Sequence, residues 1–248
     1  VVVMPVDLLG KAADYTAIIP IAARYDVPVI ADAAEALGAF HGGRPAGSFG
    51  QTAGISFNGN KVMTTSGGGM LLTDDAATAQ RTRYLATQAR QPAVHYEHTE
   101  IGYNYRLSNL LAALGRAQIE RLPAMIERRR QIRDVYKAVF EPVAGVEIFG
   151  AAGDEADNCW LTSIIVDPAV AGWAPSELGA HLGEDDIESR PLWKPMHSQP
   201  VFHDARSTTT GAAERLFQRG LTLPSGSVLD EAAIARVTSR IESFLGTR

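Results

Sequence analysis

Short apolar runs alternate with helix-like patterns in the first third of the chain. Apolar runs of four to six residues predict strands, and apolar positions three and four apart predict helices. The predicted order is a strand at Val1–Val6, a helix at Ala13–Tyr25, strands at Pro28–Asp32, Ala53–Phe57 and Met70–Thr73, and a helix capped by Asp74 or Asp75 and running to about Arg90. Strands interleaved with helices indicate an α/β fold with functional groups at the strand ends.

From Ser108 onward the pattern is mainly helical. One helix is predicted at Ser108–Leu122, and Pro123 is well placed to open a second one that runs to about Phe140. The segment Pro142–Asp157 is rich in Gly, Ala and Pro and is a candidate boundary. Beyond it the pattern predicts a strand at Trp160–Val166, a helix at Pro175–Leu182, a strand at Ile187–Arg190, and helices at Gly211–Arg219 and Asp230–Phe244. We therefore predict a large domain over residues 1–130 and a small α+β domain over 131–248, with a hinge in the long helical stretch.

Composition narrows the class of protein. The 248 residues are 46% hydrophobic and 21% charged, and the net charge is −5, which argues against a nucleic-acid partner. The arginines at 128, 129, 130 and 133 follow a helical pattern and fit a solvated helix face. No apolar run is long enough to cross a bilayer. The single Cys159 fits a reducing cytoplasm, and His95 and His98 lack the partners of a metal site.

Lys61 has an unusual setting. It is one of four lysines and the only charged residue between Pro45 and Thr73, in a run of Gly, Ser, Thr and apolar side chains. Such neighbours would desolvate the lysine and favour a neutral, nucleophilic amine. Taken alone, the pattern fits a surface lysine in a glycine-rich turn equally well.

Asp32 ends a predicted apolar strand, and Glu35 follows one helical turn later. A carboxylate at that strand end could hold a protonated pyridine nitrogen. It could also simply cap the following turn, which is the commoner role of such a residue. Glu35 would then point toward the same site as Asp32.

Several segments together resemble the DegT/DnrJ/EryC1/StrS family of sugar aminotransferases. They fall in the family's order and spacing from Val1 nearly to the C-terminus. The matching segments are DAAEALGA at 32–39, GSFG at 47–50, SFNGNK at 56–61, TTSGGG at 64–69, EIGYNYRLSN at 100–109, AALG at 112–115, QIERL at 118–122 and SRPLWKPMH at 189–197. The resemblance implies the aspartate-aminotransferase-like fold (fold type I of the pyridoxal-phosphate enzymes), an α/β large domain followed by a small α+β domain.

The resemblance also implies roles for individual residues. Lys61 would form the Schiff base with pyridoxal 5′-phosphate and move protons during transfer. Asp32 would pair with the pyridine nitrogen, and Ser56 would bind the cofactor phosphate. Asn104 would reach the cofactor of a partner subunit, which implies a homodimer with a shared active site. His197, with Trp193 from the same motif, would lie near the nucleotide-sugar pocket, although His197 could equally be a hydrogen-bonded loop histidine.

Glu35 departs from the family's commonest pattern, which has glutamine or histidine near the cofactor's O3′. Together with the motif around Trp193 and His197, Glu35 resembles the subgroup that aminates UDP-4-keto-6-deoxy-N-acetylglucosamine, with glutamate as the expected amino donor. Beside O3′ an anionic carboxylate would be unfavourable, so we expect Glu35 to be neutral there or turned toward the substrate.

One part of the family pattern has no counterpart in this sequence. Family members carry a segment before the strand that opens this chain, which supplies sheet strands and a phosphate-binding turn. We therefore expect an N-terminally truncated large domain that could bind the cofactor poorly. Alternatives that stay open are an aminotransferase for a perosamine-type GDP-sugar or a 3-keto sugar, and a non-catalytic homologue.

Overall fold

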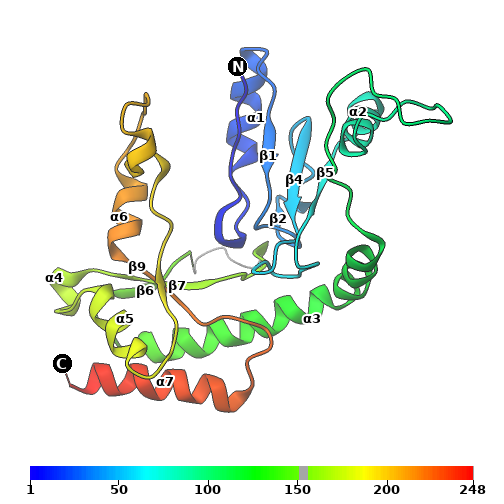
Figure 1. Cartoon of the computed structure of the whole chain (residues 1–248). Coiled ribbons are helices and arrows are strands. Elements are labelled where there is room, and N and C mark those ends of the chain that lie inside the picture. The colour runs from blue at the N-terminus through cyan, green and yellow to red at the C-terminus, as the bar shows by residue number, and fades with distance from the viewer. Residues whose placement is uncertain (151–155, 248) are drawn as a thin grey trace. The chain divides into compact units, whose positions relative to one another are not determined.

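The structure, a computed structural model, describes residues 1–150 and 156–247. By its contacts the described chain forms two compact units (Figure 1). The first comprises residues 1–127 with 156–160, and the second comprises 128–150 with 161–247. Residues 151–155, inside the predicted boundary segment, lie outside the described residues. The assignment of the two units as a large cofactor-binding domain and a small domain stays a prediction.

A three-stranded sheet organises the first unit. Strand β1 (Ile30–Asp32) pairs in parallel with β4 (Thr52–Ser56), and β4 pairs in antiparallel with β5 (Gly69–Leu72). The predicted opening strand forms only two isolated bridges to residues around β1, Val3 with Val29 and Val6 with Asp32. These bridges are parallel, so the first residues run beside β1 in the same direction.

The remaining elements of the first unit pack around this sheet or extend from it. A four-residue aromatic and small-residue core holds helix α1 against the strands, since Tyr15 stacks on Phe49 and both pack with Ala31 and Ala53. The other elements are the 3-10 helix η1 (Leu8–Gly10), α1 (Tyr15–Arg24), the hairpin of β2 (Phe40–His41) and β3 (Arg44–Pro45), and α2 (Ala76–Ala86). Asp75 caps α2, whose predicted end at Arg90 lies four residues too late.

Helix α3 (Asn109–Phe140) is a single helix of 32 residues. Pro123 lies inside it, so the prediction that Pro123 opens a second helix is wrong. Proline lacks the N–H that would bond to the carbonyl four residues earlier, and this cost usually ends or kinks a helix. In α3 the apolar and polar pattern continues on both sides of Pro123, and the helix contributes Ile132, Tyr136 and Phe140 to the core of the second unit. The burial of these three side chains outweighs the loss of the one backbone hydrogen bond at Pro123.

The second unit is built on a four-stranded antiparallel sheet in the order β6-β7-β9-β8. Its strands are β6 (Val146–Ile148), β7 (Thr162–Val166), β8 (Arg190–Pro191) and β9 (Gly220–Leu223). β6 lies in the segment predicted to be a boundary, and β9 directly follows a predicted helix without an intervening turn. Both strands are too short to show a period of their own in the sequence.

Helices cover this sheet and close its core. Leu178 and Leu182 of α5 pack with Ile164 of β7 and Ile241 of α7, and all four are fully buried. The helical segments of this unit are α4 (Pro168–Ala171), α5 (Pro175–Gly183), the 3-10 helices η3 (Met196–Ser198) and η4 (Pro200–Phe202), α6 (Ala212–Arg219) and α7 (Glu231–Gly246). The α+β character predicted for this part of the chain is what the structure has.

Candidate active site

Two of the predicted site residues end neighbouring strands of the first unit. Asp32 is the last residue of β1, and Ser56 is the last residue of β4. Because the strands are parallel, with Asp32 opposite Gly54, both side chains lie at the carboxyl edge of the same sheet. Ligands of open α/β sheets bind at that edge.

Among the described residues, each of these side chains hydrogen-bonds to a backbone N–H two positions later in the sequence. Asp32 accepts one from the backbone N–H of Ala34 through Oδ1, at 3.2 Å. This is the turn-capping contact that the sequence left open as an alternative, and it leaves the second oxygen of Asp32 available to a ligand. The hydroxyl of Ser56 accepts a bond from the N–H of Asn58 at 3.3 Å and retains its own proton to donate.

Lys61 lies in the loop between β4 and β5, and its side chain is only 13% exposed. One interpretation of the sequence was a surface lysine in a glycine-rich turn, and the low exposure of this side chain rules that interpretation out. Its Nζ lies 3.5 Å from Oε1 of Glu35 and 4.6 Å from the centre of the Trp160 ring. A carboxylate and an aromatic face both attract a cation, so the amine is held in one place at the edge of the site.

Glu35 lies in the turn that follows β1, where it joins two parts of the site. Its Oε2 accepts a hydrogen bond from the N–H of Leu9 at 2.8 Å, while Oε1 faces Lys61. In this structure the carboxylate is thus turned toward the lysine and toward η1. The expected relation of Glu35 to the cofactor's O3′ or to a substrate stays a prediction.

The other predicted residues lie elsewhere in the chain. Asn104 is exposed in the first unit, where it forms an isolated bridge with Thr87. Trp193 and His197 belong to the second unit, and Trp193 is 41% exposed. The ring Nε2 of His197 lies 2.5 Å from Oε1 of Glu214, so this histidine is hydrogen-bonded, as its plainer interpretation expected. The backbone N–H of Glu214 and then the His197 ring hold the pKa of the Glu214 carboxyl below its ordinary value.

Two residues that touch the site were not identified from the sequence. Trp160 provides the ring beside Lys61, and Asn158 bonds to the turn that carries Glu35. Both follow the segment that was predicted to be a boundary, and neither belongs to a motif of charged or nucleophilic residues. Only the fold brings them, about 100 residues from Lys61, to this edge of the first unit.

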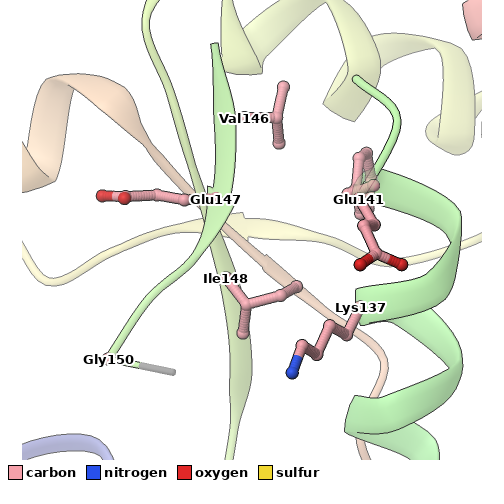
Figure 2. Close-up of a pocket in the computed structure, with 7 residues that line it drawn as sticks. Lys137, Glu141, Val146, Glu147, Ile148 and Gly150 are labelled. Carbon is pink, nitrogen blue, oxygen red and sulfur yellow. The ribbon is translucent and has the colours of Figure 1, made fainter. Parts of the chain in front are cut away.

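The second unit has an open pocket between the end of α3 and β6 (Figure 2). Figure 2 shows Glu147 pointing away from Lys137 and Glu141. The lining residues are Lys137, Phe140, Glu141, Val146, Glu147, Ile148 and Gly150. None of the predicted site residues lines it, so this pocket is separate from the candidate active site.

The described residues form neither a metal cluster nor a membrane span. In the part of the chain that the structure describes, no cluster of three or more His, Cys, Asp or Glu side chains is arranged to hold a metal ion. Nor does any helix among residues 1–150 and 156–247 combine the length and the apolar character that a membrane span needs.

Similar proteins of known family match nearly all of this chain. EpsN of Bacillus subtilis strain 168, described as a pyridoxal phosphate-dependent aminotransferase, is 46% identical over 239 residues, which are 95% of this chain and 61% of EpsN. The GDP-perosamine synthase of Escherichia coli O157:H7 is 34% identical and covers 98% of this chain, which spans 65% of that enzyme. The chain thus spans somewhat less than two thirds of these relatives.

A solved structure is similar to this chain over nearly its whole length. DesI, determined in the presence of its TDP-sugar product, superimposes with a TM-score of 0.88 at 26% identity, over 98% of this chain and 62% of DesI. The fold is therefore that of the pyridoxal-phosphate-dependent sugar aminotransferases, as the sequence predicted.

The family comparison covers residues 1–242 of the 248. It bears out the resemblance that the motifs around Asp32, Lys61 and Asn104 indicated, and it indicates pyridoxal phosphate as the cofactor. The chain belongs to the DegT/DnrJ/EryC1/StrS aminotransferase family.

Proposed function

We propose that this chain carries the lysine and the ring-nitrogen partner of a pyridoxal-phosphate aminotransferase that moves an amino group from glutamate to a 4-keto-6-deoxy nucleotide sugar. The observation that supports this most directly is the site at the edge of the first sheet. There Asp32 and Ser56 end adjacent parallel strands, and the nearly buried Lys61 lies in the loop that follows.

The residues present fit the cofactor. Asp32 has a free carboxylate oxygen for a protonated ring nitrogen, and Ser56 has a hydroxyl proton for a phosphate oxygen. When bound, pyridoxal phosphate supplies an electron sink for the carbon that loses its proton. Asp32 would keep that ring nitrogen protonated through charge pairing.

Lys61 would perform the proton transfers at the reacting carbon. Its Nζ can take up and return a proton, and its position is set by Glu35 and Trp160. Delivery of the proton from one fixed nitrogen would give the aminated sugar carbon a single configuration. The low exposure of Lys61 keeps water away from the nitrogen during this step.

A cofactor-binding experiment tests the proposal. Addition of pyridoxal phosphate to the chain should produce a visible absorbance band in the unmodified protein and in Lys137→Ala, which removes an exposed lysine of the second unit. The band should be absent in Lys61→Ala. An unmodified chain without the band, or an equal band in Lys61→Ala, would contradict the proposal.

The choice of nucleotide is part of the same proposal. Glu35 and the motif around Trp193 and His197 favour a UDP-linked sugar. A GDP-linked sugar is the second candidate, and the 34% identity to a GDP-perosamine synthase favours it. Turnover of matched UDP- and GDP-4-keto-6-deoxy sugars with glutamate distinguishes them. Only the correct sugar nucleotide should accept the amino group repeatedly and so sustain formation of 2-oxoglutarate beyond one equivalent per cofactor.

A homodimer with a shared site and a cytoplasmic location complete the proposal. Asn104 is exposed, as a residue that serves a partner subunit must be in the single chain. The single cysteine of the chain, Cys159, is buried, which fits a compartment that keeps thiols reduced.

A further inference from the structure

Residues Asp157–Trp160 return to the first unit after the chain has already entered the second one. They make side-chain contacts with three parts of the first unit that are far away in the sequence. Asp157 forms an ion pair with Lys11 at 2.6 Å. Asn158 and Trp160 bond to the Glu35 turn and to the Lys61 loop. We call Asp157–Trp160 the return segment.

Asn158 ties the return segment to the turn that carries Glu35. Its side chain is fully buried, and its Nδ2 donates to the carbonyls of Glu35 and Leu37, at 2.8 and 3.0 Å. Its Oδ1 accepts from the N–H of Trp160 at 2.9 Å. A buried amide with both donor protons and its acceptor in use fixes the backbones that it joins.

Gly10 shows how closely the return segment approaches. Its φ is +90°, a conformation that favours glycine, and a Cβ there would lie 2.0 Å from Oδ1 of Asn158. The backbone N–H of Asn158 bonds to the Gly10 carbonyl at 3.2 Å. Any other residue at position 10 would push the return segment away from the Glu35 turn.

Trp160 ties the return segment to the lysine loop. Its indole Nε1 donates to the carbonyl of Asn60 at 2.7 Å, directly before Lys61 in the sequence. The same indole ring faces the Lys61 Nζ, and Trp160 is only 2% exposed. One side chain therefore fixes both the backbone of the loop and the amine at the end of the lysine.

We propose that the return segment positions Lys61, with Trp160 as the positioning residue. In the chain without cofactor, the Trp160 ring and the Glu35 carboxylate hold the amine between them, and the indole N–H fixes the loop. The inference rests on the proposed function only in taking Lys61 as the amine that joins the cofactor. The alternative is that Trp160 merely fills space in the core.

Reductive methylation of the full chain without cofactor separates these two roles. Formaldehyde with dimethylamine borane converts accessible amines to dimethylamines, and peptide mass spectrometry measures each lysine separately. The exposed Lys137 and Lys194 serve as internal standards. Because the ring shields the amine and attracts its ammonium form, its removal should speed the reaction of Lys61.

Three variants give the expected order. Trp160→Leu removes the ring and the N–H, and we expect it to raise the rate at Lys61 relative to Lys194 by about three- to thirtyfold. Trp160→Phe keeps a ring without the N–H and should give a smaller increase. The matched control is Phe49→Leu, which removes a buried aromatic ring of the same unit that stacks on Tyr15. This control should leave the ratio unchanged.

Two results would overturn the proposal. One is an unchanged ratio in a Trp160→Leu chain whose circular dichroism and thermal transition are those of a folded protein. The other is an equal rise in Phe49→Leu, which would indicate general loosening of the unit. If Trp160→Leu does not fold, Trp160→Phe decides, since loss of the Asn60 bond alone must still raise the ratio. Failure of the unmodified chain to bind pyridoxal phosphate would contradict the proposed function and leave this measurement intact.

Discussion

Among the single residues of this site, the carboxylates of Glu35 and Asp32 differ in what they contact. The Glu35 carboxylate accepts a bond from the Leu9 N–H and faces Lys61, while the Asp32 carboxylate accepts one from the N–H of Ala34 in the following turn. A third carboxylate, that of Asp7, is fully buried, and the backbone N–H of Asp7 donates to the carbonyl of Asp32 at 2.9 Å. Asp7 and Asp32 are therefore neighbours, although the sequence singled out only Asp32.

The pH dependence of stability should report on Asp7. Its Oδ1 accepts bonds from the Ala13 N–H and the Tyr15 hydroxyl, and within the described part of the chain its buried Oδ2 has no hydrogen-bond partner. Burial raises the pKa of Asp7 above its ordinary value of 3.8, and the charge of Asp32 adds to this. A raised pKa means that the folded state binds the proton more tightly, so this stabilisation is complete below pH 3.8 and is lost as the pH rises through the folded pKa.

Asp7→Asn removes that titration and keeps an acceptor for both bonds. Relative to the unmodified chain, the variant should gain stability as the pH rises from about 4 to 7. The measurement is urea unfolding of both proteins across this pH range. Subtracting one free energy of unfolding from the other cancels the contributions of the other titrating groups. A difference that is constant with pH would show that Asp7 does not titrate in this way.

At the scale of elements, packing decides where local signals are weak or contradictory. α3 continues through Pro123 because its later turns supply core residues to the second unit. β9 forms directly after α6 because β7 and β8 present edges on both of its sides. In contrast, α1, α2 and α7 begin directly after the N-cap residues Asp14, Asp75 and Asp230, and each of these starts lies within two residues of the predicted one.

Gly220 marks the tight junction between α6 and β9. Its φ of −97° is open to any residue, yet a Cβ would lie 2.6 Å from the carbonyl oxygen of Leu216 and 2.0 Å from Cδ1 of Leu192. Gly220→Ala should therefore lower the free energy of unfolding of the second unit by about 1–3 kcal/mol. Gly183→Ala, where a Cβ meets nothing within 4 Å, is the matched control and should be neutral or stabilising. Thermal unfolding of both variants checks the prediction, and equal effects would contradict it.

Pro123 leaves α3 without the hydrogen bond to the Ile119 carbonyl. Pro123→Ala should restore this hydrogen bond and slow amide hydrogen exchange over residues 119–127, by about 5- to 150-fold for a gain of about 1–3 kcal/mol. Pro123 is exposed, so no core contact is lost. Ala124→Gly, at the next exposed position, should speed exchange over the same residues. Slower exchange in the glycine variant, or faster exchange in the alanine variant, would show that local propensity does not control this part of α3.

At the scale of the whole molecule, the chain consists of two units, and the predicted cofactor residues and the predicted substrate residues fall in different ones. Asp32, Glu35, Ser56, Lys61 and Asn104 belong to the first, and Trp193 and His197 belong to the second. The boundary does not fall at a single point in the sequence, because the return segment, with Trp160, belongs to the first unit.

The proposed shared site makes a prediction about mixed dimers. In a homodimer whose site combines Lys61 of one chain with Asn104 of the other, Lys61→Ala and Asn104→Ala should each be inactive. A hybrid of the two variants regains one intact site. Equal mixing after unfolding and refolding should then restore about a quarter of the unmodified activity. Activity no greater than that of the separate variants would exclude a site shared in this way.

Local periodicity and the ordered motifs were enough to predict the family, the α/β character of the first part and the candidate residues Asp32, Ser56 and Lys61. The strand-end position of Asp32 follows directly from the apolar run before it. Three features became known only from the folded chain: α3 runs through Pro123, β6 and β9 are strands, and Trp160 and Asn158 lie beside Lys61 and Glu35. All three have the same cause. A local pattern records what a residue prefers, whereas contacts between residues about 100 positions apart arise only when the chain has folded.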